Sequence, residues 1–303
     1  MPHLATALRT TLMMGSLLAL GLTSSLAARA TTDQPDALTA AEDKPAPRLI
    51  SQDGLEVLLY PLDRGEDGFK VITVVRADGL KPFVTETDTY RLTFGPHVSI
   101  GKLSKTDAYP SAMLQTFTGG AHCCTVVTIV TARAGQLQAI EVGTFDGGPP
   151  DTFPTDLDGD GIADFRLRDD RFLYVFASYA GSWAPPRFLN VTDGQVADVS
   201  ARPGFRKQME SFAADAKAAC ADLDNSERNG ACAAYVAVQA RLGSFAQAME
   251  TVTPFVNRSE DAPLPTGCRV DAPLGGCPEN QEIRFTRFEE ALQWFLTRTG
   301  YIG

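Results

Sequence analysis

The feature that most limits the fold of this 303-residue chain is a change of hydrophobic period near Pro203. From Leu49 to about Ser200, short segments rich in Val, Ile, Phe, Tyr and Thr are separated by turn residues such as Asp78-Gly79 and Asp193-Gly194. This is the pattern of antiparallel strands. After Pro203, apolar residues recur at helical spacing instead. The sequence therefore predicts an α+β fold, in which a β-rich antiparallel meander precedes a helical C-terminal part.

Nine segments of the first part read as strands. They are residues 55–60, 69–76, 89–94, 112–117, 125–132, 137–144, 162–168, 172–179 and 187–191. The stretch 125–191 is similar to a propeller blade, but the chain has too few strands for a complete propeller. A curved sheet or a sandwich is the expected arrangement.

The second part reads as helices. Phe205, Met209, Phe212 and Ala216 share one helical face, and residues 232–242 repeat that spacing, which predicts an αα-hairpin packed on the sheet. The last helix should begin at the capping box Thr286-x-x-Glu289 and end before Gly300.

Residues 156–164 read Asp-Leu-Asp-Gly-Asp-Gly-Ile-Ala-Asp, a spacing that suits a calcium loop. The side chains of Asp156, Asp158, Asp160 and Asp164 would supply hard oxygen ligands for Ca²⁺, and Ile162 would supply its backbone carbonyl. An EF-hand is excluded because its twelfth loop position would be Leu167, which cannot ligate. The residues after the loop alternate apolar and polar, so the loop is expected to lead into a strand.

This loop resembles those of FG-GAP and VCBS repeats, which occur in integrin α-chain propellers and in many secreted bacterial proteins. The resemblance covers about a tenth of the chain; it implies a Ca²⁺ site between strands and says little about activity. The stretch 117–125 (Phe-Thr-Gly-Gly-Ala-His-Cys-Cys-Thr), taken with the loop and the aromatic segment 171–179, also looks like a combination found in uncharacterised exported bacterial proteins. That likeness implies a family without naming a reaction.

The N-terminus carries an expected export signal. Residues 1–30 contain Arg9, an apolar run and an Ala28-Arg29-Ala30 cleavage site, and no acidic residue. Residues 31–48 are expected to be a flexible tether, residues 49–202 the β-rich domain with the calcium loop, and residues 203–303 the helical region with a disulfide loop. The protein is thus predicted to be periplasmic or secreted, with no membrane span in its mature form.

Removing the signal changes the formal net charge from −10 to −12. A surface this acidic disfavours nucleic acid as a partner and suits a divalent cation.

Six cysteines agree with an oxidising compartment. We expect Cys220 to pair with Cys232, and Cys268 with Cys277. Cys123 and Cys124 are adjacent, and would form either a vicinal disulfide or two free thiols on opposite sides of a strand.

The sequence contains no motif that names a catalytic reaction. His122 and Cys124 would share a strand face and could form a thiol–imidazole pair. Carboxylates for a hydrolase are also available, at Glu86, Asp88, Asp146, Asp169 and Asp170. We expect an exported, calcium-stabilised binding or structural protein of the cell envelope, without catalysis and with an envelope protein or a glycan as its partner. The alternative is an envelope hydrolase or a thiol enzyme using these acidic residues or His122 and Cys124.

Overall fold

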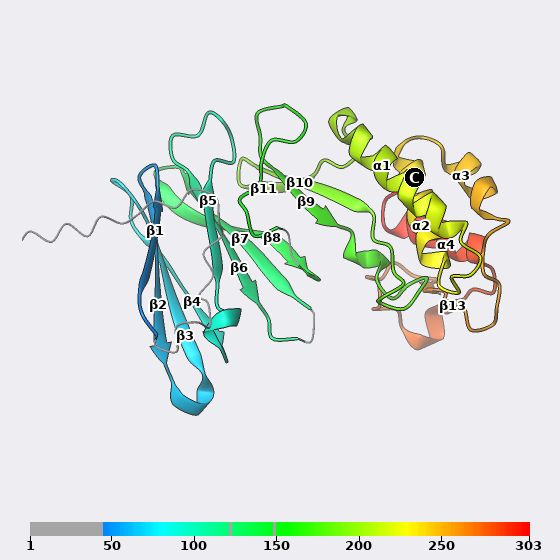
Figure 1. Ribbon diagram of the computed structural model, residues 1–303, viewed down its shortest axis with the longest axis horizontal. Helices are drawn as coiled ribbons and strands as arrows, with labels where there is room; N and C mark the ends of the chain where they lie inside the picture. Colours follow the sequence, from blue (N-terminus) through cyan, green and yellow to red (C-terminus); the bar gives the residue numbers. More distant parts are fainter. Residues whose placement is uncertain (1–44, 121–122, 148–149) are drawn as a thin grey trace, which may run out of the picture.

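The computed structural model describes residues 45–120, 123–147 and 150–303 (Figure 1). The predicted signal peptide, residues 1–30, lies outside the described residues, as does most of the predicted tether. The first strand begins at Arg48, the last residue assigned to that tether.

The described chain is arranged in four layers (Figure 1). Two four-stranded antiparallel sheets face each other, a three-stranded sheet covers the second of them, and the helices lie on the far side of the third sheet. The fold is therefore α+β, with the sheets in the N-terminal part and the helices in the C-terminal part, as the change of period predicts.

Both four-stranded sheets are simple meanders, with strands paired in chain order. The first contains β1 (Arg48–Gln52), β2 (Leu55–Asp63), β3 (Phe69–Ala77) and β4 (Phe83–Thr89). The second contains β5 (His97–Gly101), β6 (Ser111–Phe117), β7 (Thr125–Arg133) and β8 (Gln136–Phe145). The tight turns Asp53-Gly54 and Ala134-Gly135 have positive φ at both residues, as two-residue hairpins of this twist require.

The second sheet is buried on both faces. Leu114 of β6 packs with Leu55 and Val57 in the core between the two sheets, whereas its neighbour Met113 packs with Phe165 in the core beneath the third sheet. This double burial explains why residues 111–115 are buried without interruption, while β2 alternates buried and exposed positions.

The third sheet joins the β layers to the helices. It consists of β9 (Asp164–Arg168), β10 (Pro186–Thr192) and β11 (Gln195–Asp198), in the order β11-β10-β9. Successive residues of β10 face opposite layers: Leu189 enters the core shared with the second sheet, and Phe188 stacks on Phe205 in the helical core, with ring centroids 4.1 Å apart.

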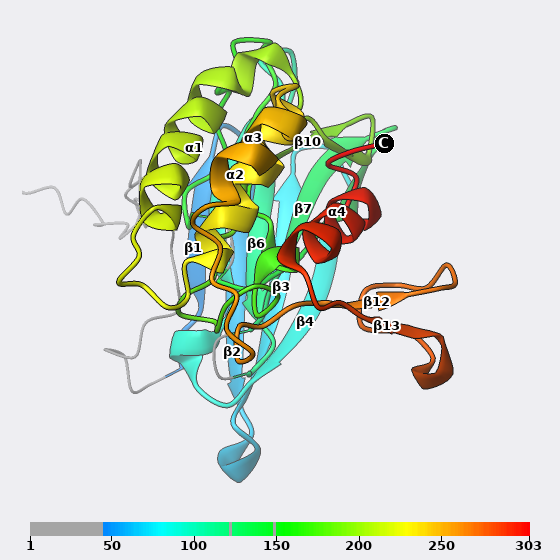
Figure 2. The same cartoon turned by 90° about the vertical axis from the view of Figure 1, so that its right-hand side faces the viewer.

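The helical part contains α1 (Arg206–Cys220), α2 (Asn229–Arg241), α3 (Phe245–Val252) and α4 (Phe288–Arg298). A short hairpin of β12 (Thr266–Cys268) and β13 (Glu282–Arg284) extends away from α4 (Figure 2). The first ten residues of α2 are all buried. None of the helices that the structure describes is long and apolar enough to cross a membrane.

Three local expectations are wrong. Residues 89–94 are not a strand: Thr89 ends β4, and Leu92–Phe94 form a 3-10 turn. The strand β4 itself turns three threonines inward, so its sequence lacks the apolar alternation that marks a strand. Residues 172–179 are not a strand: Tyr174 has φ of 62°, and Phe172 and Phe176 both enter the helical core.

The third error concerns the start of α4. Arg287 occupies the N-cap position, and no side chain caps this helix. The carboxylate of Glu289, predicted to close the capping box, instead accepts a hydrogen bond from Arg258. Gly300 ends the helix as expected, with φ of 74°.

Candidate metal centre

The acidic loop lies between β8 and β9 and is closed by backbone pairing. The Asp164 amide donates to Thr155 O over 2.9 Å, which joins the two ends of the loop at the first residue of β9. The loop also pairs with the segment that follows β5, because the Ala163 amide donates to Leu103 O over 2.7 Å. A strand therefore anchors the loop on its C-terminal side, as its sequence pattern predicts.

Three of the aspartates converge. Asp156, Asp158 and Asp164 each offer a carboxylate oxygen, and these three oxygens lie within 4.8 Å of one another. Backbone amides hold two of these side chains in place: Gly159 and Gly161 donate to Asp156, and Leu157 donates to Asp164. Both glycines have φ near +90°, a conformation that lets the loop turn around the three carboxylates.

Asp164 is the most unusual member of this triad. Its residue is 2% exposed, and its Oδ1 atom is buried with no hydrogen-bond partner. Across the sheet, Asn190 donates from Nδ2 to Ala163 O over 3.3 Å. Burial raises the pKa of Asp164, and the negative charges of Asp158 and Asp160 raise it further. The Leu157 amide and the Asn190 side chain oppose this rise in pKa. A cation within the triad would offset this cost, because buried charges are normally paired or bound to a metal.

Two basic side chains approach the loop from outside. Lys105 Nζ lies 2.6 Å from Asp156 Oδ2, and Arg202 Nη1 lies 2.7 Å from Asp160 Oδ2. Asp160 is thus directed toward Arg202 and does not join the triad. The Ile162 amide donates to Asp160 Oδ1 over 2.8 Å; the roles predicted for Asp160 and for the Ile162 carbonyl as ligands stay predictions.

Each cysteine forms a disulfide with the neighbouring cysteine in the sequence. The pairs are Cys123–Cys124, Cys220–Cys232 and Cys268–Cys277. The second pair links the end of α1 to α2. Because Cys124 is bonded to Cys123, a thiol mechanism would require prior reduction. The proposed partner of that mechanism, His122, lies outside the described residues.

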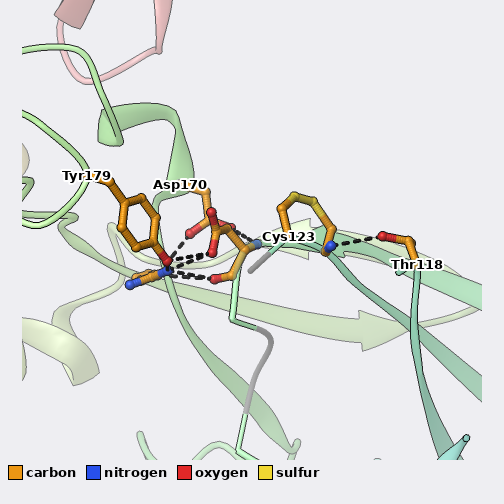
Figure 3. Close-up of a disulfide and its surroundings, with 7 residues drawn as sticks. Thr118, Cys123, Asp170 and Tyr179 are labelled. Carbon is orange, nitrogen blue, oxygen red and sulfur yellow. Dashed lines mark hydrogen bonds and ion pairs between the residues drawn. A yellow bond between two sulfur atoms is a disulfide. The ribbon is translucent and has the colours of Figure 1, made fainter. Parts of the chain in front are cut away.

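A hydrogen-bonded network of charged and polar side chains lies near the vicinal disulfide (Figure 3). Arg168 donates to both Asp146 and Asp170, and the Tyr179 hydroxyl donates to Asp146 Oδ1 over 2.8 Å. Burial raises the pKa of Asp170, whereas the Asp146 amide and Arg168 lower it. Both oxygens of Asp170 accept hydrogen bonds, which favours a role in holding the loops over a role as a free catalytic acid.

From the sequence, Asp146 and Asp170 are only available carboxylates, Tyr179 is a possible groove residue beside Trp183, and Arg168 has no predicted role. Asp146 follows β8, Arg168 ends β9, and Tyr179 lies in a loop misread as a strand. No local spacing connects these positions, so only the pairing of the sheets brings them together.

Comparison with known proteins points to a specific set of relatives. Residues 205–300, which include the four α-helices of the described chain, match the family model described as the sll0997 C-terminal domain. The chain is 35% identical over 211 residues to the probable thylakoid lumen protein sll0997 of Synechocystis sp., and 33% identical over 263 residues to the uncharacterized protein y4bJ of Sinorhizobium fredii. The chain is a homologue of both proteins.

These alignments cover 68% and 85% of this chain. The chain spans 60% of the length of the first relative and 41% of the second. No solved structure gives a significant match. The predicted likeness to a family of unassigned activity agrees with these relatives, whereas none of these matches shows the FG-GAP resemblance.

Proposed function

We propose that this chain is an exported, calcium-stabilised binding or structural protein, in which Ca²⁺ ties the loop 156–164 to strand β9. The observation that carries the proposal is the convergence of three aspartate oxygens around a buried Asp164 whose Oδ1 atom has no hydrogen-bond partner. Carboxylate oxygens are the ligands that Ca²⁺ prefers, and loops of this kind commonly bind it to stabilise extracellular modules. The FG-GAP and VCBS resemblance supports the same ion.

Export is the second part of the proposal. The relative from Synechocystis sp. is described as a probable thylakoid lumen protein, a compartment reached by crossing a membrane. Three disulfides among the described residues suit an oxidising compartment outside the cytoplasm. For this chain we propose a periplasmic or secreted location, with an envelope protein or glycan as the partner.

A thermal melt in excess Ca²⁺ and in chelator tests the metal site. A ligand at about 100 times its Kd stabilises the folded state by about 2.7 kcal/mol, so Ca²⁺ should raise Tm by several degrees and Mg²⁺ by less. Asp158→Asn removes one member of the triad and should abolish most of the shift, while leaving Tm in chelator nearly unchanged.

Asp78→Asn is the matched control, because Asp78 lies in the exposed turn after β3 and is not a member of the triad. It should keep the full Ca²⁺ shift. The metal site would be contradicted by equal Tm values in Ca²⁺ and chelator, or by an Asp158→Asn variant that keeps the wild-type shift.

A further inference from the structure

The described residues of the stretch 117–125, which are 117–120 and 123–125, have no part in the metal centre, and they lie at the other end of the second sheet. His97 begins β5 and pairs with Gln115 near the end of β6, whereas the metal loop contacts the segment beyond the other end of β5. The end of β6, the start of β7 and the end of β8 lie at the same end of the sheet as His97. Residues from all four strands or their adjoining loops therefore gather there.

A pocket of about 290 Å³ opens at this end of the second sheet. This volume is at the lower end of the range for small-molecule sites, about 300–1,000 Å³. Its lining includes Phe94, Phe117, His97, Gln115 and Asp151. The pocket thus combines aromatic rings with side chains that can form hydrogen bonds.

The aromatic side of the pocket continues onto the surface. Phe94 lies between Phe117 and Tyr90, with ring centroids 5.7 and 5.1 Å away, and the rings are tilted by 33° in both pairs. Phe94 is 37% exposed and Tyr90 is 57% exposed. Large aromatic side chains grouped at a pocket mouth mark a surface for binding a ligand with an apolar face.

The polar side of the pocket retains hydrogen-bonding capacity. His97 Nδ1 is buried without a hydrogen-bond partner, and it lies 3.9 Å from Asp151 Oδ1, too far for a hydrogen bond; the His97 side chain as a whole is 33% exposed. Asp151 is about half exposed at its side chain. Gln115 is 4% exposed and is held by its amide, which donates to Pro150 O over 3.2 Å. A rigid buried amide and an accessible carboxylate are suited to fixing the hydroxyl groups of a ligand.

Charge narrows the class of ligand. No lysine or arginine is among the described residues that line the pocket, and Asp151 adds a negative charge. Gly147 of the lining follows Asp146, and the nearby Arg168 is already paired with Asp146 and Asp170. Anionic ligands are therefore disfavoured, and a purely apolar ligand would leave buried polar groups without partners.

We propose that this pocket binds a neutral saccharide. One sugar ring would place its apolar face against Phe94 and Phe117, and its hydroxyl groups would bond to Asp151, His97 and Gln115. The proposal gives a ligand class to the binding role proposed above and rests on that role, but the pocket contains none of the candidate Ca²⁺ ligands, so the two can fail separately.

Isothermal titration calorimetry of the intact protein, in Ca²⁺ buffer, tests the proposal with cellotriose, triacetylchitotriose, maltotriose and spermidine as probes. At least one trisaccharide should bind, and spermidine should not. Phe94→Ala and Asp151→Asn should each weaken the binding by about tenfold, which corresponds to 1.4 kcal/mol. Tyr60→Ala removes a comparably exposed aromatic ring from the first sheet and should bind as the wild type does.

Three results would overturn the proposal: no binding of any trisaccharide, binding of spermidine alone, or trisaccharide binding that survives both substitutions. The Ca²⁺-dependent melt of each variant checks its fold. A protein that binds a trisaccharide but shows no Ca²⁺ shift would refute the metal site while supporting the pocket.

Discussion

Two buried aspartates, Asp169 and Asp164, differ in how completely the surrounding protein satisfies their hydrogen-bonding capacity. Asp169 is 1% exposed and is fully engaged, because Arg171 forms a salt bridge with it and the Tyr301 hydroxyl donates to its Oδ2 over 2.9 Å. Asp164 is equally buried but has one unbonded oxygen. The first carboxylate is satisfied by the protein alone, whereas the second needs a further partner.

Tyr301→Phe tests the satisfied site. The variant keeps the buried ring but removes one hydrogen bond to the Asp169 carboxylate, so the free energy of unfolding should fall by about 1.5–3 kcal/mol. Urea denaturation with the disulfides intact measures this change. Tyr60→Phe, which alters an exposed tyrosine, should change stability little. An unchanged free energy in the Tyr301 variant would show that the buried hydroxyl contributes nothing.

Helix α4 has no side-chain cap at its N-terminus, and core packing and a hydrogen bond from Arg258 stabilise it instead. Phe288, Leu292, Phe295 and Leu296 bury one face in the helical core. At its first turn, Glu289 accepts hydrogen bonds from Arg258, which ties the helix to the segment after α3. The Arg258 hydrogen bond lowers the pKa of Glu289, although burial partly opposes it.

This pairing predicts a pH dependence. A carboxyl group whose pKa is lowered by folding stabilises the protein above its unfolded pKa, and this contribution is lost as the pH falls through the folded value. Unfolding free energies of the wild type and Glu289→Gln should therefore differ most near neutral pH and converge as the pH falls below the ordinary value of 4.5. Glu290→Gln, whose partner Arg287 lies on the exposed surface, is the control and should show a smaller difference. A constant difference across this range would contradict the pairing.

At the scale of the whole molecule, one short segment connects the proposed metal and saccharide sites. Pro150 O accepts the hydrogen bond from Gln115 at the pocket, Phe153 packs so closely on Gly101 that no side chain fits there, and Thr155 pairs with Asp164 at the metal loop. Residues 150–155 thus run along the second sheet from one site to the other.

We expect Ca²⁺ to order this segment. In hydrogen-exchange mass spectrometry, adding Ca²⁺ should slow exchange most in peptides covering 150–164, because the amides of Leu157, Gly159 and Gly161 donate to the triad carboxylates. The β12–β13 hairpin, which extends away from α4 and has no part in the loop, should be unaffected (Figure 2). Equal slowing in both regions would argue against a local metal site.

Much of the fold could be predicted because it depends on local patterns. Strands such as β2, β3, β7 and β10 follow from alternating or β-branched sequences, and α1 and α2 follow from helical spacing. The prediction failed where propensity and tertiary environment disagree: residues 172–179 have strand composition, but the helical core draws in Phe172 and Phe176 four residues apart. The core thus overrides a local preference of only about 1 kcal/mol.

The two candidate sites also contain features that local sequence predicts and features that it does not. The acidic loop could be predicted from the residues alone, because its aspartates and glycines are close together in the chain and converge within one turn. Three arrangements appear only in the folded protein: Asp164 is buried with an unbonded oxygen, Asp160 turns to Arg202, and His97, Gln115 and Asp151 meet at a pocket. These arrangements depend on pairing between strands and loops far apart in the chain, and the energy of such pairing is not carried by any short stretch of residues.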